Sequence, residues 1–145
     1  MIGLLQRVSE AHVAIGGRQV GSIERGLLVL IGVRPADDAA AATRLLDRLL
    51  KYRVFADDQD KMNLSLTQVG GGLLLVPQFT LAADTAKGLR PGFSTAAPPE
   101  QGRRLFDALV KAARDELGGV QSGLFGAHMQ VSLTNDGPVT IWLES

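Results

Sequence analysis

The chain contains no cysteine, only two histidines and no excess of either charge, since 15 basic residues are balanced by 15 acidic ones. Without thiols it has no disulfide framework, no thiolate nucleophile and no thiolate zinc site. Two histidines, His12 and His128, are too few for a three-histidine metal centre. A formal net charge of zero argues against binding nucleic acid through bulk phosphate neutralisation, but it leaves open a small pocket that grips only a nucleic-acid end.

Long apolar runs are also absent. The first seven residues lack the basic stretch and apolar core of a signal peptide, and no apolar run reaches the roughly 18 residues of a membrane span. We therefore expect a soluble, cytoplasmic protein. Of the 145 residues, 46% are hydrophobic and 21% charged, which is typical of a globular chain and predicts one domain over residues 1–145 with an ordinary core.

The periodicity of the apolar residues predicts an α+β fold. Loose alternation predicts a strand or a bent pair of strands over 2–15. Apolar runs predict strands over 19–23, 26–33, 64–69 and 73–81, and the region 120–144 is also strand-rich. Two amphipathic helices are predicted, one from Asp37 or Asp38 to about Tyr52 and one from Pro98 to Leu117. Glycines predict hairpin turns at 16–17 and 70–72, and residues 82–97 are predicted to form a long loop.

The segment from Asn135 to Thr140 carries the first unusual motif, Asn-Asp-Gly-Pro-Val-Thr, between two strand-like runs. Asn-Asp-Gly is typical of a hairpin turn, because these residues tolerate positive φ angles. The proline that follows removes a ladder N–H, and it makes Gly137–Pro138 the best candidate in the chain for a cis peptide bond. A tight turn that fixes backbone carbonyls in space could grip an ammonium group without a charged side chain.

The second unusual motif, Gln78-Phe79-Thr80-Leu81, ends a strongly apolar run. Gln78 offers an amide, Thr80 offers a hydroxyl, and the backbone N–H groups could stabilise an oxyanion. Neither motif contains a His, Cys or Lys to activate a nucleophile, so Thr80 is a poor candidate for direct attack. Thr80 could equally be an ordinary β-forming residue at a strand end.

Together the two motifs resemble the signature pair of the D-aminoacyl-tRNA deacylase family. The resemblance extends at constant register over essentially the whole chain. It includes 6–8, 26–30, 61–64, 82–85, 90–91 and 129–133.

The resemblance implies an α+β fold in which antiparallel and mixed β-sheets form a barrel-like core with two main helices. It implies a homodimeric enzyme that hydrolyses the ester between a D-amino acid and the 3′-terminal adenosine of tRNA, and that also removes mischarged glycine. In the family the Gly-Pro bond is cis, and its turn enters the partner subunit's pocket, where its carbonyls face the substrate amino group. An L side chain would collide with this turn, whereas a D side chain points away.

The resemblance also assigns residues. Gln78, Phe79 and Thr80 would be catalytic. Residues that would bind substrate or shape the turn are Gly137, Pro138, Asn135, Val139, Arg7 and Met129, with Arg7 packing against the turn. Because an aminoacyl ester is already activated, we expect backbone N–H groups near Phe79 and Thr80 to hold the carbonyl oxygen while the 2′-hydroxyl of the terminal ribose helps to activate water. Thr80 would orient substrate or water, and no cofactor is expected.

One position departs from the family pattern. Pro77 stands where the family usually has Ser, so a hydroxyl and a backbone N–H are lost. This change could alter the range of substrates, or it could only stiffen the end of the strand.

Other polar residues have simpler interpretations. His12 and His128 are expected to have no catalytic role, and 57–61 reads as a solvated turn without the spacing of a calcium loop. Five basic residues could contact tRNA phosphates or be ordinary surface charge: Lys87, Arg90, Arg103, Arg104 and Lys111. Two other functions stay open. One is a binding module for an amine-bearing small molecule, and the other is a metal-dependent deacylase, although the chain offers few nitrogen or sulfur ligands.

Overall fold

The computed structural model describes all 145 residues. The strands are β1 Ile2–Ile15, β2 Arg18–Ile23, β3 Gly26–Gly32, β4 Arg53–Ala56, β5 Met62–Ser65, β6 Gly72–Pro77, β7 Val120–Ser122 and β8 Gln130–Glu144. The helices are α1 Ala39–Lys51, α2 Leu66–Val69 and α3 Pro99–Glu116, with a 3₁₀ turn, η1, at Phe79–Ala82. The α+β class with two main helices, α1 and α3, is confirmed.

Strand β1 is the centre of a six-stranded sheet of order β2-β1-β3-β6-β7. Its first half pairs with β3 and its second half with β2, whereas β8 pairs with β1 along almost its whole length. β1 is antiparallel to β2, β3 and β8, whereas β3, β6 and β7 run parallel to one another. The sheet curls until its ends approach, since a Cβ placed on Gly21 of β2 would lie 3.3 Å from the Ser122 carbonyl of β7. The result is a nearly closed, barrel-like sheet, as the resemblance implied.

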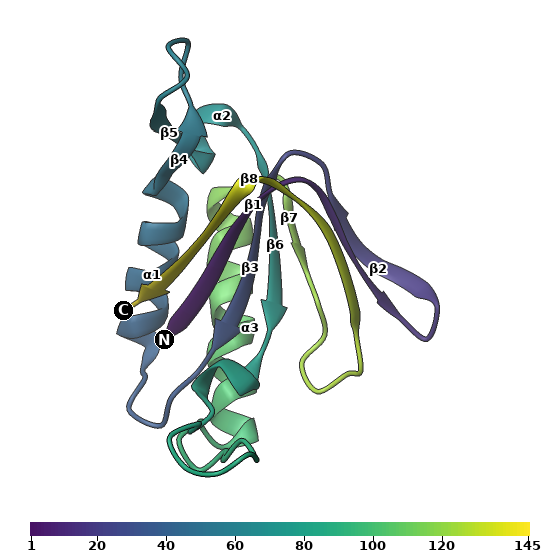
Figure 1. Ribbon diagram of the computed structural model, residues 1–145, viewed down its shortest axis with the longest axis vertical. Coiled ribbons are helices and arrows are strands. Elements are labelled where there is room, and N and C mark those ends of the chain that lie inside the picture. The colour runs from purple at the N-terminus through teal and green to yellow at the C-terminus, as the bar shows by residue number, and fades with distance from the viewer.

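Both β1 and β8 bend sharply near the upper end of the molecule (Figure 1). The bend divides the apolar interior into two clusters. The larger one lies between the sheet and the two long helices and includes Leu5, Leu27, Leu45 and Phe106. The smaller one, which includes Val8, Val13 and Leu74, lies under the curled half of the sheet. The inward-facing apolar side chains of β1 therefore pack into the larger cluster before the bend and into the smaller cluster after it.

The long helices form where the sequence predicts them. Asp38 caps α1 by accepting a hydrogen bond of 2.8 Å from the Ala41 N–H, which satisfies a donor that the first helical turn leaves free. Proline occupies the first turn of α3, where its missing N–H costs nothing. Each helix buries an apolar stripe, and the two stripes meet in the larger core.

Several local predictions are wrong. The strand expected over 64–69 ends at Ser65, because its side chain and that of Gln68 form a capping box that starts α2. The glycines at 70–72 form no hairpin. Gly70 has a left-handed conformation and ends α2, after which β6 runs parallel to β3. The strand expected over 73–81 ends at Pro77 and gives way to η1. Strand β4 was not predicted.

The largest correction concerns the segment around Gly137. It is not a hairpin turn, because β8 is a single strand that pairs with β1 on both sides of the motif. Gln6 pairs with Thr140 and Val8 pairs with Asn135, so residues 136–139 stand opposite Arg7 alone and bulge from the ladder. The Gly137–Pro138 bond is cis, as the sequence suggested.

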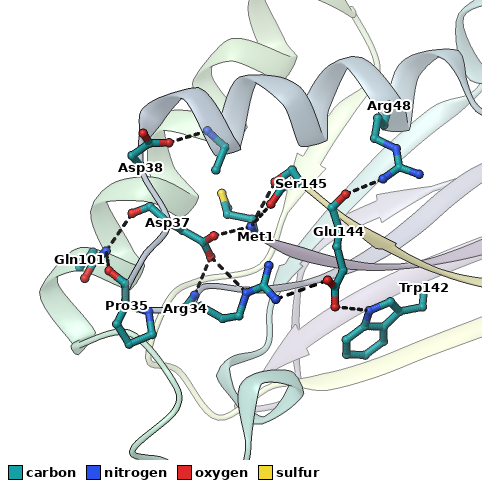
Figure 2. Close-up of polar contacts among 11 residues, drawn as sticks. Met1, Arg34, Pro35, Asp37, Asp38, Arg48, Gln101, Trp142, Glu144 and Ser145 are labelled. Carbon is teal, nitrogen blue, oxygen red and sulfur yellow. Dashed lines mark hydrogen bonds and ion pairs between the residues drawn. The ribbon is translucent and has the colours of Figure 1, made fainter.

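The start of β1 and the end of β8 are joined by a polar cluster, drawn in Figure 2. The Met1 ammonium group lies 2.6 Å from the Asp37 carboxylate and also donates to Ser145. The Glu144 carboxylate accepts hydrogen bonds from Trp142 and Arg34. No helix in the structure has the length and apolar character needed to cross a membrane.

Candidate active site

The second sequence motif lies where β6 ends and η1 begins. The Gln78 N–H still donates to the Ile31 carbonyl of β3 (2.7 Å), so the residue is fixed at the sheet edge. Its side-chain amide donates to the Thr80 hydroxyl oxygen at 2.5 Å. The Thr80 hydroxyl accepts in this contact, so its own hydrogen stays available for a further hydrogen bond. Its only hydrogen-bond partner in the structure is Gln78, so no base is in place to make it a nucleophile.

The backbone at the start of η1 offers hydrogen-bond donors. The first N–H groups of a helical turn have no acceptor inside that turn, and these belong to Phe79 and Thr80. No side chain caps them. The arrangement is therefore suited to holding an oxygen that carries partial negative charge.

An apolar cavity of about 440 Å³ opens beside this turn. Its walls come from the ends of β3 and β6, from α3 and from the segment before β8. They include Pro77, Gln78, Phe79, Phe106, Phe125, His128 and Met129. Three residues that the sequence singled out, Gln78, Phe79 and Met129, thus share one cavity, with Thr80 held to Gln78 at its edge.

The cavity has aromatic walls that sequence reasoning missed. Phe106 lies within the predicted helix from Pro98 to Leu117, but neither it nor Phe125 was proposed as a site residue. Phe125 comes from the irregular stretch between β7 and β8, where it precedes a glycine with φ +81°, and no periodicity marks such a residue. The Arg103 guanidinium lies 5.2 Å from the centre of its ring and donates to its carbonyl at 3.3 Å, so it supports this wall from outside.

The Gly-Pro bulge forms a second group of candidate residues. Arg7, largely buried, donates through Nε to the Asp136 carbonyl (2.8 Å) and through Nη1 to the Val54 carbonyl of β4 (2.6 Å). The Asn135 side chain accepts from the Val139 N–H at 2.7 Å and donates to the Thr140 hydroxyl at 2.9 Å. Side chains on both sides therefore hold the shape of the bulge, while Gly137 and Pro138 at its tip are exposed.

The two groups do not meet within one chain. Gln78 is level with Gly3 of β1, through Ile31, whereas the bulge stands opposite Arg7. This separates them by roughly 13 Å along the strands and by three strand spacings, about 14 Å, across the sheet. Figure 1 shows the bend of β8 at the upper end of the molecule and η1, below β6, near the lower end. No residue of 135–139 lines the cavity.

The ionisable groups with clearly shifted pKa values lie outside the cavity. Hydrogen bonds from Asn63 and from the Lys61 N–H lower the pKa of Asp57, which organises the turn between β4 and β5. The Trp142 N–H and then the Arg34 charge lower the pKa of Glu144. No three His, Cys, Asp or Glu side chains gather in a group that could hold a metal ion.

Comparison with known proteins gives a consistent result over the full length. The family model described as D-Tyr-tRNA(Tyr) deacylase matches residues 4–144. A protein of Azotobacter vinelandii named D-aminoacyl-tRNA deacylase is 59% identical over 145 residues, and one of the same name from Pseudomonas fluorescens is 61% identical. In both cases the match covers 100% of each chain.

Solved structures agree on the fold. A structure titled c-Myc DNA Unwinding Element Binding Protein superposes with a TM-score of 0.95 at 37% identity, covering 100% of this chain and 99% of that one. A structure of a probable eukaryotic D-amino acid tRNA deacylase gives a TM-score of 0.85 at 20% identity, covering 99% and 98%. The second similarity concerns the fold alone.

Proposed function

We propose that the cavity beside η1 holds the 3′-terminal adenosine of the tRNA and its ester. The premise is that this chain belongs to the D-Tyr-tRNA(Tyr) deacylase family and is a hydrolase of D-aminoacyl-tRNA esters. The observation that carries the proposal is the position of the Phe79 and Thr80 backbone donors at the edge of this cavity. Its volume falls within the range of about 300–1,000 Å³ usual for small-molecule pockets. Because the substrate is aminoacyl-tRNA, we place the enzyme in the cytoplasm.

The chemistry needs no protein nucleophile. Water attacks the ester carbonyl carbon, and the bond from that carbon to the ribose oxygen breaks, releasing a free D-amino acid and tRNA. The Phe79 and Thr80 N–H groups stabilise the negative charge that develops on the carbonyl oxygen, and one such donor is worth about 2.7–4 kcal/mol. The vicinal 2′-hydroxyl helps to activate the water, and the Thr80 hydroxyl, oriented by Gln78, positions water or substrate.

Chiral selection is assigned to the Gly-Pro bulge of a second subunit. The separation of the bulge from the cavity in one chain supports this assignment, since the two can act together only across a homodimer interface. The carbonyls of the bulge would face the substrate α-amino group, leaving room for a hydrogen or a D side chain but not for an L side chain. Glycine attached to tRNA, which has no side chain, would also be cleaved.

The test is hydrolysis of D-tyrosyl-tRNA, L-tyrosyl-tRNA and glycyl-tRNA at low enzyme concentration. We expect the D ester and the glycyl ester to be cleaved and the L ester to be spared. Cleavage of the D and L esters at similar rates would refute the bulge as a chiral gate, and cleavage of no ester would refute the assigned site. A D-tyrosyl ester on a 2′-deoxy terminus tests the ribose-assisted step, which predicts a large loss of rate.

A further inference from the structure

The loop between η1 and α3 is a folded element with a fixed base. Backbone hydrogen bonds of 2.8 and 2.9 Å join Asp84 and Gly92 in both directions. The Thr95 hydroxyl donates to the Ala82 carbonyl at 2.5 Å, and the Ala97 N–H donates to the Val33 carbonyl at 2.9 Å. We call residues 84–95 the 84–95 loop. Its residues 85–91 are exposed, and they lie beyond the lower ends of β6 and α3 (Figure 1).

After Asp84 at its base, this loop carries charges of one sign only. Residues 85–97 include Lys87 and Arg90 but no aspartate or glutamate. The carboxylate of Asp84, at the base, accepts a hydrogen bond from the Ala86 N–H at 2.9 Å, so it is directed into the loop's own backbone. Neither cation forms an ion pair, in contrast to Lys111, which pairs with Asp115 at 2.8 Å. In a chain of zero net charge, the 84–95 loop is thus a local cationic site without an acidic partner for either cation.

The tip of the loop is also unusual. Leu89 is fully exposed between the two cations, next to Gly88, whose φ of +70° makes the turn. An apolar side chain flanked by cations matches a single-stranded nucleic acid, which presents phosphates and the faces of unpaired bases. An acidic peptide would satisfy the charges, but it would not lie beside the ester site.

The loop lies next to the proposed active site through one aromatic contact. The Phe93 ring packs against the Phe79 ring with centroids 5.0 Å apart and planes inclined by 59°. Phe79 lines the cavity and begins the turn that offers the backbone donors. A polynucleotide that ends in the cavity therefore passes within reach of the loop.

We propose that the 84–95 loop binds the single-stranded segment that precedes the terminal adenosine of the tRNA, with Lys87 and Arg90 on its phosphates and Leu89 against a base or ribose. This inference rests on the proposed function. It assigns recognition of the polynucleotide to the loop and recognition of the esterified adenosine to the cavity.

The experiment compares two substrates of different length. The double variant Lys87→Gln/Arg90→Gln should lose about fivefold to tenfold in kcat/KM on D-tyrosyl-tRNA but less than twofold on 3′-D-tyrosyl-adenosine, which lacks the preceding phosphates. For two single-strand phosphate contacts, the slope of log(kcat/KM) against log[salt] should become shallower by about 1.4. Leu89→Ser keeps both charges, so it should lower kcat/KM on the tRNA without changing the slope.

The matched control is Arg18→Gln/Arg44→Gln, which removes two exposed cations from β2 and α1 that form no ion pair and should leave both substrates unaffected. An equal loss on both substrates would mean that the loop supports the cavity, and no loss on the tRNA would mean that it is ordinary surface; either result overturns the inference. If the wild type cleaves neither substrate, the proposed function fails. The loop is then tested separately, by measuring binding of a labelled CCA-ended acceptor hairpin through fluorescence anisotropy. Equal binding by wild type and double variant would then reject it.

Discussion

At the scale of single residues, Gly137 has the least freedom to change. Its φ is +147°, which L side chains rarely adopt, and a Cβ there would lie 2.8 Å from the Val139 N and Cγ2 and 3.3 Å from Arg7 Nη2. We expect Gly137→Ala to cost about 1–3 kcal/mol of stability, the usual range for strained backbone. We also expect a more than tenfold loss of D-tyrosyl-tRNA hydrolysis, because the bulge must shift away from Arg7. Thermal melting and single-turnover rates measure the two effects.

Gly16→Ala is the matched control for this substitution. Gly16 has φ +57°, but nothing lies within 4 Å of the added methyl group, and the residue is in the β1–β2 hairpin. This variant should lose some stability and keep its rate. If Gly137→Ala loses no more activity than Gly16→Ala, the shape of the bulge is not needed for catalysis.

At the scale of elements, the polar cluster that joins the start of β1, the end of β8 and the segment between β3 and α1 should respond to pH through Glu144. Hydrogen bonding from Trp142 and the charge of Arg34 lower the pKa of Glu144 in the folded protein. A depressed carboxyl pKa contributes stability above the unfolded pKa, and this contribution is lost as the pH falls through the folded pKa. Trp142 is the only tryptophan and is half exposed, so its emission should change in that acidic window.

A fluorescence titration from neutral to acidic pH at constant ionic strength measures this change, with Glu144→Gln as the comparison. The variant keeps an acceptor for the Trp142 N–H but has no proton to gain, so the transition should disappear. A transition that persists unchanged in Glu144→Gln would assign it to another group.

The elements that sequence could predict are those with an unambiguous period. Helices α1 and α3 have clean apolar stripes and defined starts, and the prediction is close to their observed bounds. Strand β8 shows the limit. Asn-Asp-Gly-Pro is compatible with a turn, and only the pairing of both halves of β8 with β1 distinguishes a bulge from a hairpin. At residues 66–69 a capping box overrides an apolar run that reads as a strand.

The candidate site divides in the same way. Gln78 and Thr80 could be proposed because a polar motif interrupts an apolar strand, and their hydrogen bond follows from their closeness in sequence. Phe125 lines the cavity from an irregular segment. Its position depends on Arg103 of α3, an exposed residue 22 positions earlier in the chain. Local patterns contain no information about such contacts.

At the scale of the whole molecule, the distance between the cavity and the bulge allows a direct test of a shared active site. One subunit carries Gln78→Ala/Thr80→Ala, which damages the cavity edge and leaves the bulge intact. The other carries Gly137→Ala, which damages the bulge and leaves the cavity intact. If the site forms across a homodimer interface, the mixed dimer contains one intact pairing. Co-expression with two affinity tags isolates that species, and D-tyrosyl-tRNA hydrolysis measures it.

The expected activity of the mixed dimer is about half that of the wild type per dimer, because one of its two sites combines both damaged parts. Each variant alone must be strongly impaired, and the parent dimers provide that baseline. A site contained within one chain predicts the opposite, since neither subunit would then hold both intact parts and the mixed dimer would be as inactive as its parents. The same preparation should spare L-tyrosyl-tRNA, because its one working site faces an undamaged bulge. The mixed dimer therefore tests the assembly and the origin of chiral selection together.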